Sequence, residues 1–156
     1  MPNIHFIWVG KLKQPHWRDA AAHYQKALGR HYTLRETVVK DGPGSLSIQD
    51  RNEREGEKIL AALQPPDYGV ALDERGTARS SVSLAKFLNT IIETPGATPC
   101  FIIGGAYGLA PAVKEQCRQT LSLGPMTFPH EMARVILLEQ LYRAASILKG
   151  LPYHHQ

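Results

Sequence analysis

Short apolar runs that alternate with longer stretches of helical periodicity constrain the fold of this chain more than any other feature. The apolar runs cover residues 4–9, 32–39, 68–72 and 99–103. The stretches with helical periodicity cover residues 17–28, 50–63, 84–92 and about 131–149. Strands that alternate with helices at this spacing are typical of βαβ units. We therefore expect an α/β fold with a mostly parallel sheet and helices on both faces.

Length and composition predict a single domain that spans residues 1–156. The chain is 43% hydrophobic and 21% charged, and we find no internal repeat and no linker. Its formal charge of +4 fits an anionic partner, but it fits a solvated enzyme surface equally well. No apolar stretch approaches the roughly 18 residues of a membrane span. Two cysteines are too few for a disulfide framework or a zinc site, so we expect a cytoplasmic protein without membrane contact.

The last helical stretch is apolar around most of its circumference. Its apolar residues are Met132, Ala133, Val135, Ile136, Leu137, Leu138, Leu141, Ala144, Ala145, Ile147 and Leu148. A helix of this kind must be buried on more than one side. In so small a domain, a homodimer interface is the natural cover for the second side.

A glycine-rich turn follows the fourth apolar run and is a candidate cofactor loop. Gly104, Gly105 and Gly108 would let a ligand approach the backbone at the carboxyl end of a strand, although glycines that serve only a tight connection are equally compatible. A P-loop would need Lys and then Ser or Thr after its glycines, but Leu109-Ala110-Pro111 follows here. A dinucleotide fingerprint belongs after the first strand of its unit, so NAD or FAD binding is disfavoured.

Two further groups lie nearer the carboxyl terminus. The segment 123–130 carries one glycine and two prolines, which predicts an irregular path that is either a connector or a ligand-binding loop. His130 ends it and could act as a base near neutral pH, or simply as a hydrogen-bonding group at a helix start. Arg143 lies four residues after Glu139 and could form an ordinary intrahelical ion pair. The histidines make a weak metal site, and we expect no metal.

Taken together, five segments resemble the ribosomal large-subunit pseudouridine N3-methyltransferase family, which belongs to the SPOUT superfamily. The segments are Leu72-Asp73, IIGGAYGL at 102–109, MTFPH at 126–130, EQLYRA at 139–144 and PYH at 152–154. The similarity covers essentially the whole chain. It implies a SPOUT-type α/β domain whose carboxyl-terminal segment forms a trefoil knot, and a homodimer with the cofactor pocket near the dimer interface.

The resemblance also implies a reaction and the residues that serve it. The reaction is transfer of a methyl group from S-adenosylmethionine to N3 of a pseudouridine in large-subunit (23S) ribosomal RNA, within assembled ribosomes. The implied cofactor-binding residues are Leu72, Gly104, Leu123, Gly124, Pro125, Met126, Thr127 and Phe128. The candidate catalytic residues are His130, as base or to orient the acceptor, and, near the acceptor nucleotide, Arg143, Tyr153 and His154.

One departure from the family pattern and two alternative functions remain open at this point. Family members often carry a basic residue after the Tyr-His pair, whereas His155 and Gln156 follow here, so a phosphate contact is in doubt. The first alternative is a noncatalytic ribosome-associated binding protein, which the basic charge would also permit. The second is a SPOUT methyltransferase that acts on transfer RNA.

Overall fold

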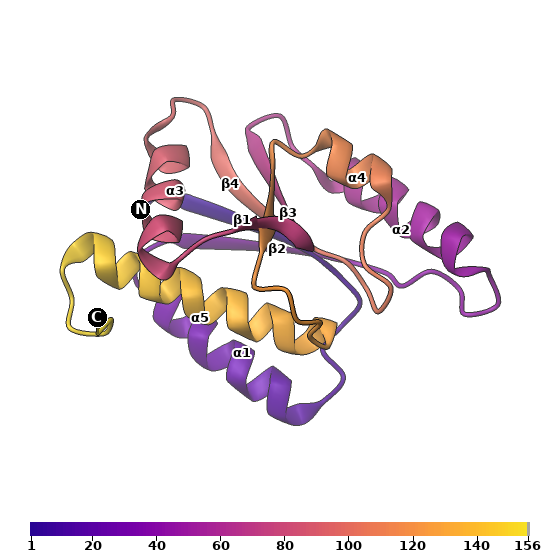
Figure 1. The fold of residues 1–156 in the computed structure, drawn as a ribbon, viewed down its shortest axis with the longest axis horizontal. Coiled ribbons are helices and arrows are strands. Elements are labelled where there is room, and N and C mark those ends of the chain that lie inside the picture. The colour runs from indigo at the N-terminus through magenta and orange to yellow at the C-terminus, as the bar shows by residue number, and fades with distance from the viewer. Residues whose placement is uncertain (156) are drawn as a thin grey trace.

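The computed structural model describes residues 1–155 and has alternating strands and helices from end to end (Figure 1). The strands are β1 (Asn3–Val9), β2 (Thr33–Val39), β3 (Asp67–Ala78), β4 (Thr98–Ile103) and β5 (Gln119–Ser122). The helices are α1 (Pro15–Leu28), α2 (Ile48–Ala62), α3 (Ser81–Glu93), α4 (Pro111–Gln116) and α5 (His130–Lys149).

The strands form one sheet in the order β2-β1-β4-β3-β5, and every neighbouring pair is parallel. Parallel neighbours cannot be joined by a tight hairpin, so a crossover segment connects each strand to the next. The predicted α/β class with a mostly parallel sheet is confirmed.

Helices cover both faces of the sheet, as the sequence predicted. Alternate side chains of β1 point to opposite faces. Phe6 and Trp8 pack in the cluster that holds the buried residues of α1, α3 and α5, whereas Ile7 and Val9 pack against α2 and α4. In Figure 1 the helices α1 and α5 lie together below the sheet, and α2 and α4 lie above it.

The predicted end of the third strand is wrong. The apolar run 68–72, followed by the polar residues 73–77, predicts a strand that ends at residue 72 and a turn after it, but β3 continues to Ala78. Leu72 and Thr77 both pair with Leu121, so the residues between them bulge out of the ladder. Charged residues at 73–75 have the composition of a turn, and only pairing with β5 shows that the strand resumes. Short apolar pieces at 121–123 and 126–128 likewise predict extended structure, whereas β5 covers Gln119–Ser122 and residues 126–128 form no strand.

The final helix, α5, finds much of its cover within the same chain. Leu137, Leu141 and Ala144 are fully buried in the cluster that α5 shares with α1, α3 and the sheet. The apolar circumference of α5 is therefore explained in large part without a second copy. The homodimer, the single domain and the trefoil knot stay predictions. Within residues 1–155, no helix combines the length and apolar character that a membrane crossing requires.

Candidate cofactor-binding and active site

A cavity of about 440 Å³ lies beyond the carboxyl ends of β3, β4 and β5. Its wall is built from residues 72–75, 103–109, 114, 121, 123–124 and 126–128 and from the start of α5. Ligands of parallel α/β sheets commonly bind outside the carboxyl ends of the strands. The volume falls within the roughly 300–1,000 Å³ that is typical of small-molecule sites.

The structure brings nearly all of the predicted cofactor-binding residues together around this cavity. The predicted residues that line it are Leu72, Gly104, Leu123, Gly124, Met126, Thr127 and Phe128, together with the candidate base His130. Pro125 is exposed and does not line the cavity. Segments that are about 50 residues apart in sequence therefore form one site.

The glycine-rich turn forms part of the wall with its backbone. The Gly108 N–H donates a hydrogen bond to the Gly105 carbonyl at 3.1 Å, and Gly108 has a φ of +81°. A Cβ atom on Gly104 would lie 2.5 Å from the Gly108 carbonyl oxygen. A side chain at Gly104 would therefore force the turn open.

Helix α2 supports this turn from behind. The Asn52 side-chain amide donates a hydrogen bond to the Tyr107 carbonyl at 3.2 Å. The Glu55 carboxylate is buried, and it accepts a hydrogen bond from the Gly42 N–H at 2.8 Å. A Cβ atom on Gly105 would lie 3.2 Å from Glu55. These contacts could not be predicted from the sequence, because residues 50–63 show only the periodicity of a charged helix.

The loop 123–128 is anchored at both ends and leaves its central backbone groups free. The Gly124 N–H donates to the Ser122 hydroxyl at 3.0 Å, and the Thr127 hydroxyl donates to the Glu74 carboxylate at 2.7 Å. Within residues 1–155, the N–H groups of Met126, Thr127 and Phe128 make no hydrogen bond to another main-chain group. Backbone donors in this position can pair with a ligand.

The bulge of β3 brings the charged side chains of Asp73, Glu74 and Arg75 to the cavity wall. Lys114 Nζ lies 3.1 Å from the Asp73 carboxylate, and the Arg75 N–H donates to that carboxylate at 3.1 Å. Burial opposes ionisation of Asp73, but these hydrogen bonds outweigh burial and hold the pKa of Asp73 below its usual value. Asp73 is therefore ionised at neutral pH.

His130 begins α5, and its imidazole lines the cavity. Burial lowers the pKa of His130, and the nearby positive charge of Arg134 lowers it further. The imidazole is therefore neutral at pH 7 and able to accept a proton.

Two charged side chains fix the start of α5 to the carboxyl end of β1. Arg134 is 2% exposed, and its guanidinium donates to the carbonyls of Val9 and Gly10, the latter at 2.7 Å. The Glu131 carboxylate accepts hydrogen bonds from the N–H groups of Lys13 and Gln14. Neither contact could be predicted from the sequence, because the partners of Arg134 and Glu131 lie more than 110 residues away along the chain.

The remaining candidate catalytic residues lie at the other end of α5. The Arg143 guanidinium donates to the Glu139 carboxylate at 2.7 Å, so the predicted intrahelical ion pair is confirmed. Arg143 Nη1 lies 3.3 Å from His154 Nδ1. The Tyr153 hydroxyl donates to Glu139 at 3.1 Å, and burial together with this carboxylate raises the pKa of Tyr153 to about 12.

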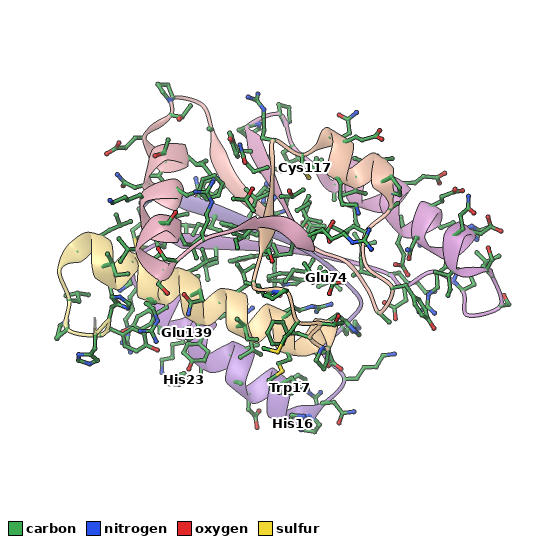
Figure 2. All side chains as sticks on the ribbon, viewed as in Figure 1. His16, Trp17, His23, Glu74, Cys117 and Glu139 are labelled. Atoms are coloured by element: carbon green, nitrogen blue, oxygen red, sulfur yellow. The ribbon has the colours of Figure 1, made fainter. Side chains whose placement is uncertain are left out.

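This second group is separate from the first cavity within one chain. Arg143 is 13 residues beyond His130, which corresponds to about 20 Å along a helix axis. Tyr153 instead lines a second cavity of about 400 Å³ with Tyr142, with the α1 residues His23 and Lys26, and with Arg30 just beyond α1. Figure 2 shows Glu139 and His23 near each other and away from Glu74. Within one chain, the same separation keeps His130 apart from His154. Gln156 lies outside the described residues.

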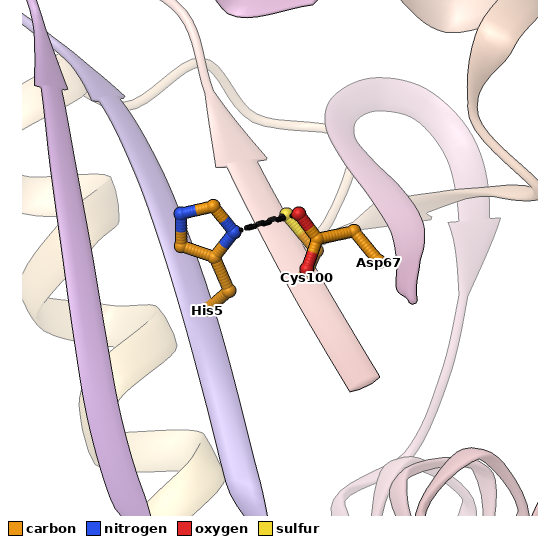
Figure 3. Close-up of side chains that lie close together, drawn as sticks. All are labelled: His5, Asp67 and Cys100. Atoms are coloured by element: carbon orange, nitrogen blue, oxygen red, sulfur yellow. Dashed lines mark hydrogen bonds and ion pairs between the residues drawn. The ribbon is translucent and has the colours of Figure 1, made fainter. Parts of the chain in front are cut away.

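A buried polar cluster on the sheet is a feature that the sequence did not indicate. His5, Asp67 and Cys100 come from β1, β3 and β4 and point toward one another (Figure 3). His5 Nδ1 lies 2.8 Å from the Asp67 carboxylate and 3.6 Å from Cys100 Sγ. Arg35 Nη2 lies 3.0 Å from the same nitrogen and 3.5 Å from Asp67. The Arg35 guanidinium therefore pairs with two of the three side chains of this cluster.

Comparisons with known proteins agree with this geometry. A family model described as "Predicted SPOUT methyltransferase" matches residues 2–154. A protein of Maridesulfovibrio salexigens named "Ribosomal RNA large subunit methyltransferase H" is 54% identical over 155 residues, which are 99% of each chain. A protein of Lawsonia intracellularis with the same name is 49% identical over 153 residues, which are 98% of each chain.

Solved structures share the fold at low sequence identity. A probable methyltransferase from Bordetella pertussis aligns with a TM-score of 0.58 and 16% identity over 92% of this chain and 96% of its own. A putative methylase family protein from Neisseria gonorrhoeae aligns with a TM-score of 0.59 and 13% identity over 99% of this chain and 86% of its own. The family model covers nearly every residue that builds the cavity, and the chain therefore belongs to the SPOUT methyltransferase family.

Proposed function

We propose that this protein transfers a methyl group from S-adenosylmethionine to N3 of a pseudouridine in large-subunit ribosomal RNA. The observation that carries the proposal is the near full-length similarity to relatives named ribosomal RNA large subunit methyltransferase H, at 54% identity for the Maridesulfovibrio protein. We further propose that the protein is cytoplasmic, that one domain carries out the reaction, and that it acts on assembled ribosomes.

The residues around the first cavity fit S-adenosylmethionine. Apolar side chains of Leu72, Ile103 and Leu121 suit the faces of an adenine ring, and the free N–H groups at 126–128 suit its polar edge. The carboxylates of Asp73 and Glu74 suit a ligand that carries a positive charge. The glycine-rich turn allows close approach because its wall is backbone.

The reaction needs little from the protein beyond placement and proton transfer. Bound S-adenosylmethionine supplies an activated methyl group on its sulfonium sulfur. The chain must hold the acceptor nitrogen in line with that group and take up the imide proton. His130 is suited to the second task, since its imidazole lines the cavity and is neutral at pH 7. The clamps formed by Glu131 and Arg134 hold the residue in place.

The separation of the two residue groups supports a homodimeric site. Arg143, Tyr153 and His154 lie at the end of α5 remote from His130, so they do not reach the first cavity of their own chain. We propose that in a dimer they approach the cavity of the other copy. There the guanidinium of Arg143 would exchange Glu139 for an RNA phosphate. The second cavity, which Tyr153 also lines, adds the basic side chains of Lys26 and Arg30.

Titration calorimetry with S-adenosylmethionine tests the cofactor assignment first. We expect micromolar binding by the wild-type protein and loss of binding in Gly104→Val, because the added side chain would displace the Gly108 carbonyl. Gly44→Ala is the matched control, since a Cβ atom there would meet nothing within 4 Å. No binding by folded wild-type protein would overturn the methyltransferase proposal in favour of a noncatalytic ribosome-binding protein.

Methyl transfer to three substrates tests the acceptor. Assembled ribosomes, protein-free large-subunit RNA and transfer RNA are each offered with radiolabelled cofactor, and the modified nucleoside is identified by mass spectrometry. We expect N3-methylpseudouridine from ribosomes and little from the other two. Equal transfer to protein-free RNA would contradict the assembled-ribosome proposal, and transfer to transfer RNA alone would contradict the ribosomal acceptor.

A further inference from the structure

One large aromatic side chain stands in solvent at the first cavity. Tyr107 is 54% exposed, although it belongs to the glycine-rich turn that lines the cavity. It occupies a tight turn between Gly105 and Gly108, so its backbone is fixed. The ring adds nothing to either buried core cluster. Core packing therefore does not explain why a tyrosine is placed there.

Neighbouring residues of α2 hold the tyrosine in this position. The Asn52 side-chain amide donates to its carbonyl at 3.2 Å. The Arg51 guanidinium carbon lies 5.7 Å from the centre of its ring, in the range of a cation–π contact. Arg51 is itself oriented by Glu55, which lies 3.4 Å from its Nε. The ring is thus presented in a fixed position and backed by a positive charge.

A fixed exposed aromatic beside an arginine suits an unpaired nucleobase. Bases that are turned out of an RNA stack bind to proteins by stacking on aromatic rings, while nearby guanidinium groups contact phosphate. A nucleotide that enters the cavity for methylation must leave its stack and lose that contact energy. An aromatic ring at the cavity restores part of this stacking energy.

We infer that Tyr107 is the stacking platform for the RNA base that enters the cavity, with Arg51 beside it to contact the backbone phosphate. This inference rests on the proposed function and names a substrate-contacting residue of the same site. The base thus stacks on Tyr107 of the same chain whose cavity it enters. The tail residues of the other copy then contact the RNA from the opposite side.

The test is steady-state methylation of ribosomes by Tyr107→Ala, Tyr107→Phe and Ile48→Ala. Loss of a stacked aromatic is expected to lower kcat/KM for ribosomes by about 10- to 100-fold. Phenylalanine keeps the stacking face, so Tyr107→Phe should retain wild-type kcat/KM. Ile48 is also 54% exposed and lies outside the cavity lining, so Ile48→Ala is the matched control and should show no change. Calorimetry should give the same cofactor affinity for all four proteins.

The outcomes separate this inference from the proposed function. If wild type is active and Tyr107→Ala has unchanged kcat/KM, the platform is overturned while the methyltransferase stands. If Tyr107→Ala loses cofactor binding in parallel with activity, Tyr107 is a cofactor contact and the platform is again overturned. If wild type methylates no RNA, both proposals fail together.

Discussion

Arg134 carries a charge that is almost fully removed from solvent. Burial lowers its pKa to about 10, which still leaves the guanidinium protonated at neutral pH. Its hydrogen bonds to the carbonyls of Val9 and Gly10 and its position 5.5 Å over the Trp8 ring offset the cost of burial. Through these hydrogen bonds Arg134 joins α5, the helix that begins with His130, to the carboxyl end of β1.

Replacing Arg134 with methionine should destabilise the fold. The change leaves buried carbonyl oxygens without a donor, which costs about 1–3 kcal/mol of the free energy of unfolding. Urea unfolding followed by circular dichroism measures the loss. Arg18→Met, at an exposed position on α1, is the control and should change stability little. Equal stability of the two variants would show that the clamp contributes nothing.

His130 should impose a pH dependence on methylation. Because burial and Arg134 lower its pKa, the neutral imidazole predominates above a midpoint that lies below 6.5. We expect kcat/KM to fall as the pH is lowered through this midpoint and to be flat between pH 7 and 8. His130→Asn should lose this limb and about 10²- to 10⁴-fold in rate. A midpoint above pH 7, or a limb that persists in His130→Asn, would exclude His130 as the base.

Sequence alone located the cavity residues but not the contacts that hold them. The resemblance pointed to Leu72, Gly104 and the segment 123–128, and the structure gathers all of them except Pro125 around one cavity. Arg134, Asn52 and Glu55 could not be assigned in this way. Their hydrogen-bond partners depend on which distant segments come together in the fold, and no local sequence pattern predicts these contacts.

At the scale of elements, periodicity predicted most helices and strands but failed where pairing with a neighbouring strand determines the structure. Strands β1 and β4 are continuous apolar runs because both faces are covered, and such runs are visible in the sequence. The second half of β3 is polar and bulged, and its residues 73–75 line the cavity rather than the core. A strand of this kind carries no apolar signal.

Helix α3 gives a direct test of a local signal that the sequence did show. Serines at 80, 81 and 83 predict a cap at the start of this helix. The structure shows that Ser80 is the cap, since its hydroxyl accepts a hydrogen bond from the Ser83 N–H at 3.0 Å. Ser80→Ala should lower the free energy of unfolding by about 1 kcal/mol, and Ser80→Asp should preserve it. Thermal unfolding of the two variants measures the difference. Indistinguishable melting temperatures would show that the cap contributes no stability.

At the scale of the whole molecule, the dimer proposal predicts complementation between inactive variants. Gly104→Val should destroy the cavity of its own chain, and Arg143→Ala should destroy the tail that serves the other copy. If each site combines the cavity of one copy with the tail of the other, random mixing of subunits gives about a quarter of wild-type activity from two inactive proteins. Co-expression followed by methylation of ribosomes measures this.

The controls for complementation use each variant by itself. Both pure variants should be inactive and should sediment as dimers. Absence of activity in the mixture, with mixed dimers demonstrated by two affinity tags, would place the cavity and the tail of a working site in the same chain. The proposed arrangement of the dimer would then be wrong.

Helix α5 links the two functional groups as one continuous rod, with His130 at its first residue and Arg143 near its far end. A single inserted residue would turn everything beyond it by about 100° and advance it by about 1.5 Å. The number of residues between His130 and Arg143 must therefore stay constant, even where the residue types vary. Insertions and deletions among homologues should accumulate in connections such as 94–97, where the chain turns at Gly96, and should be absent between 130 and 143.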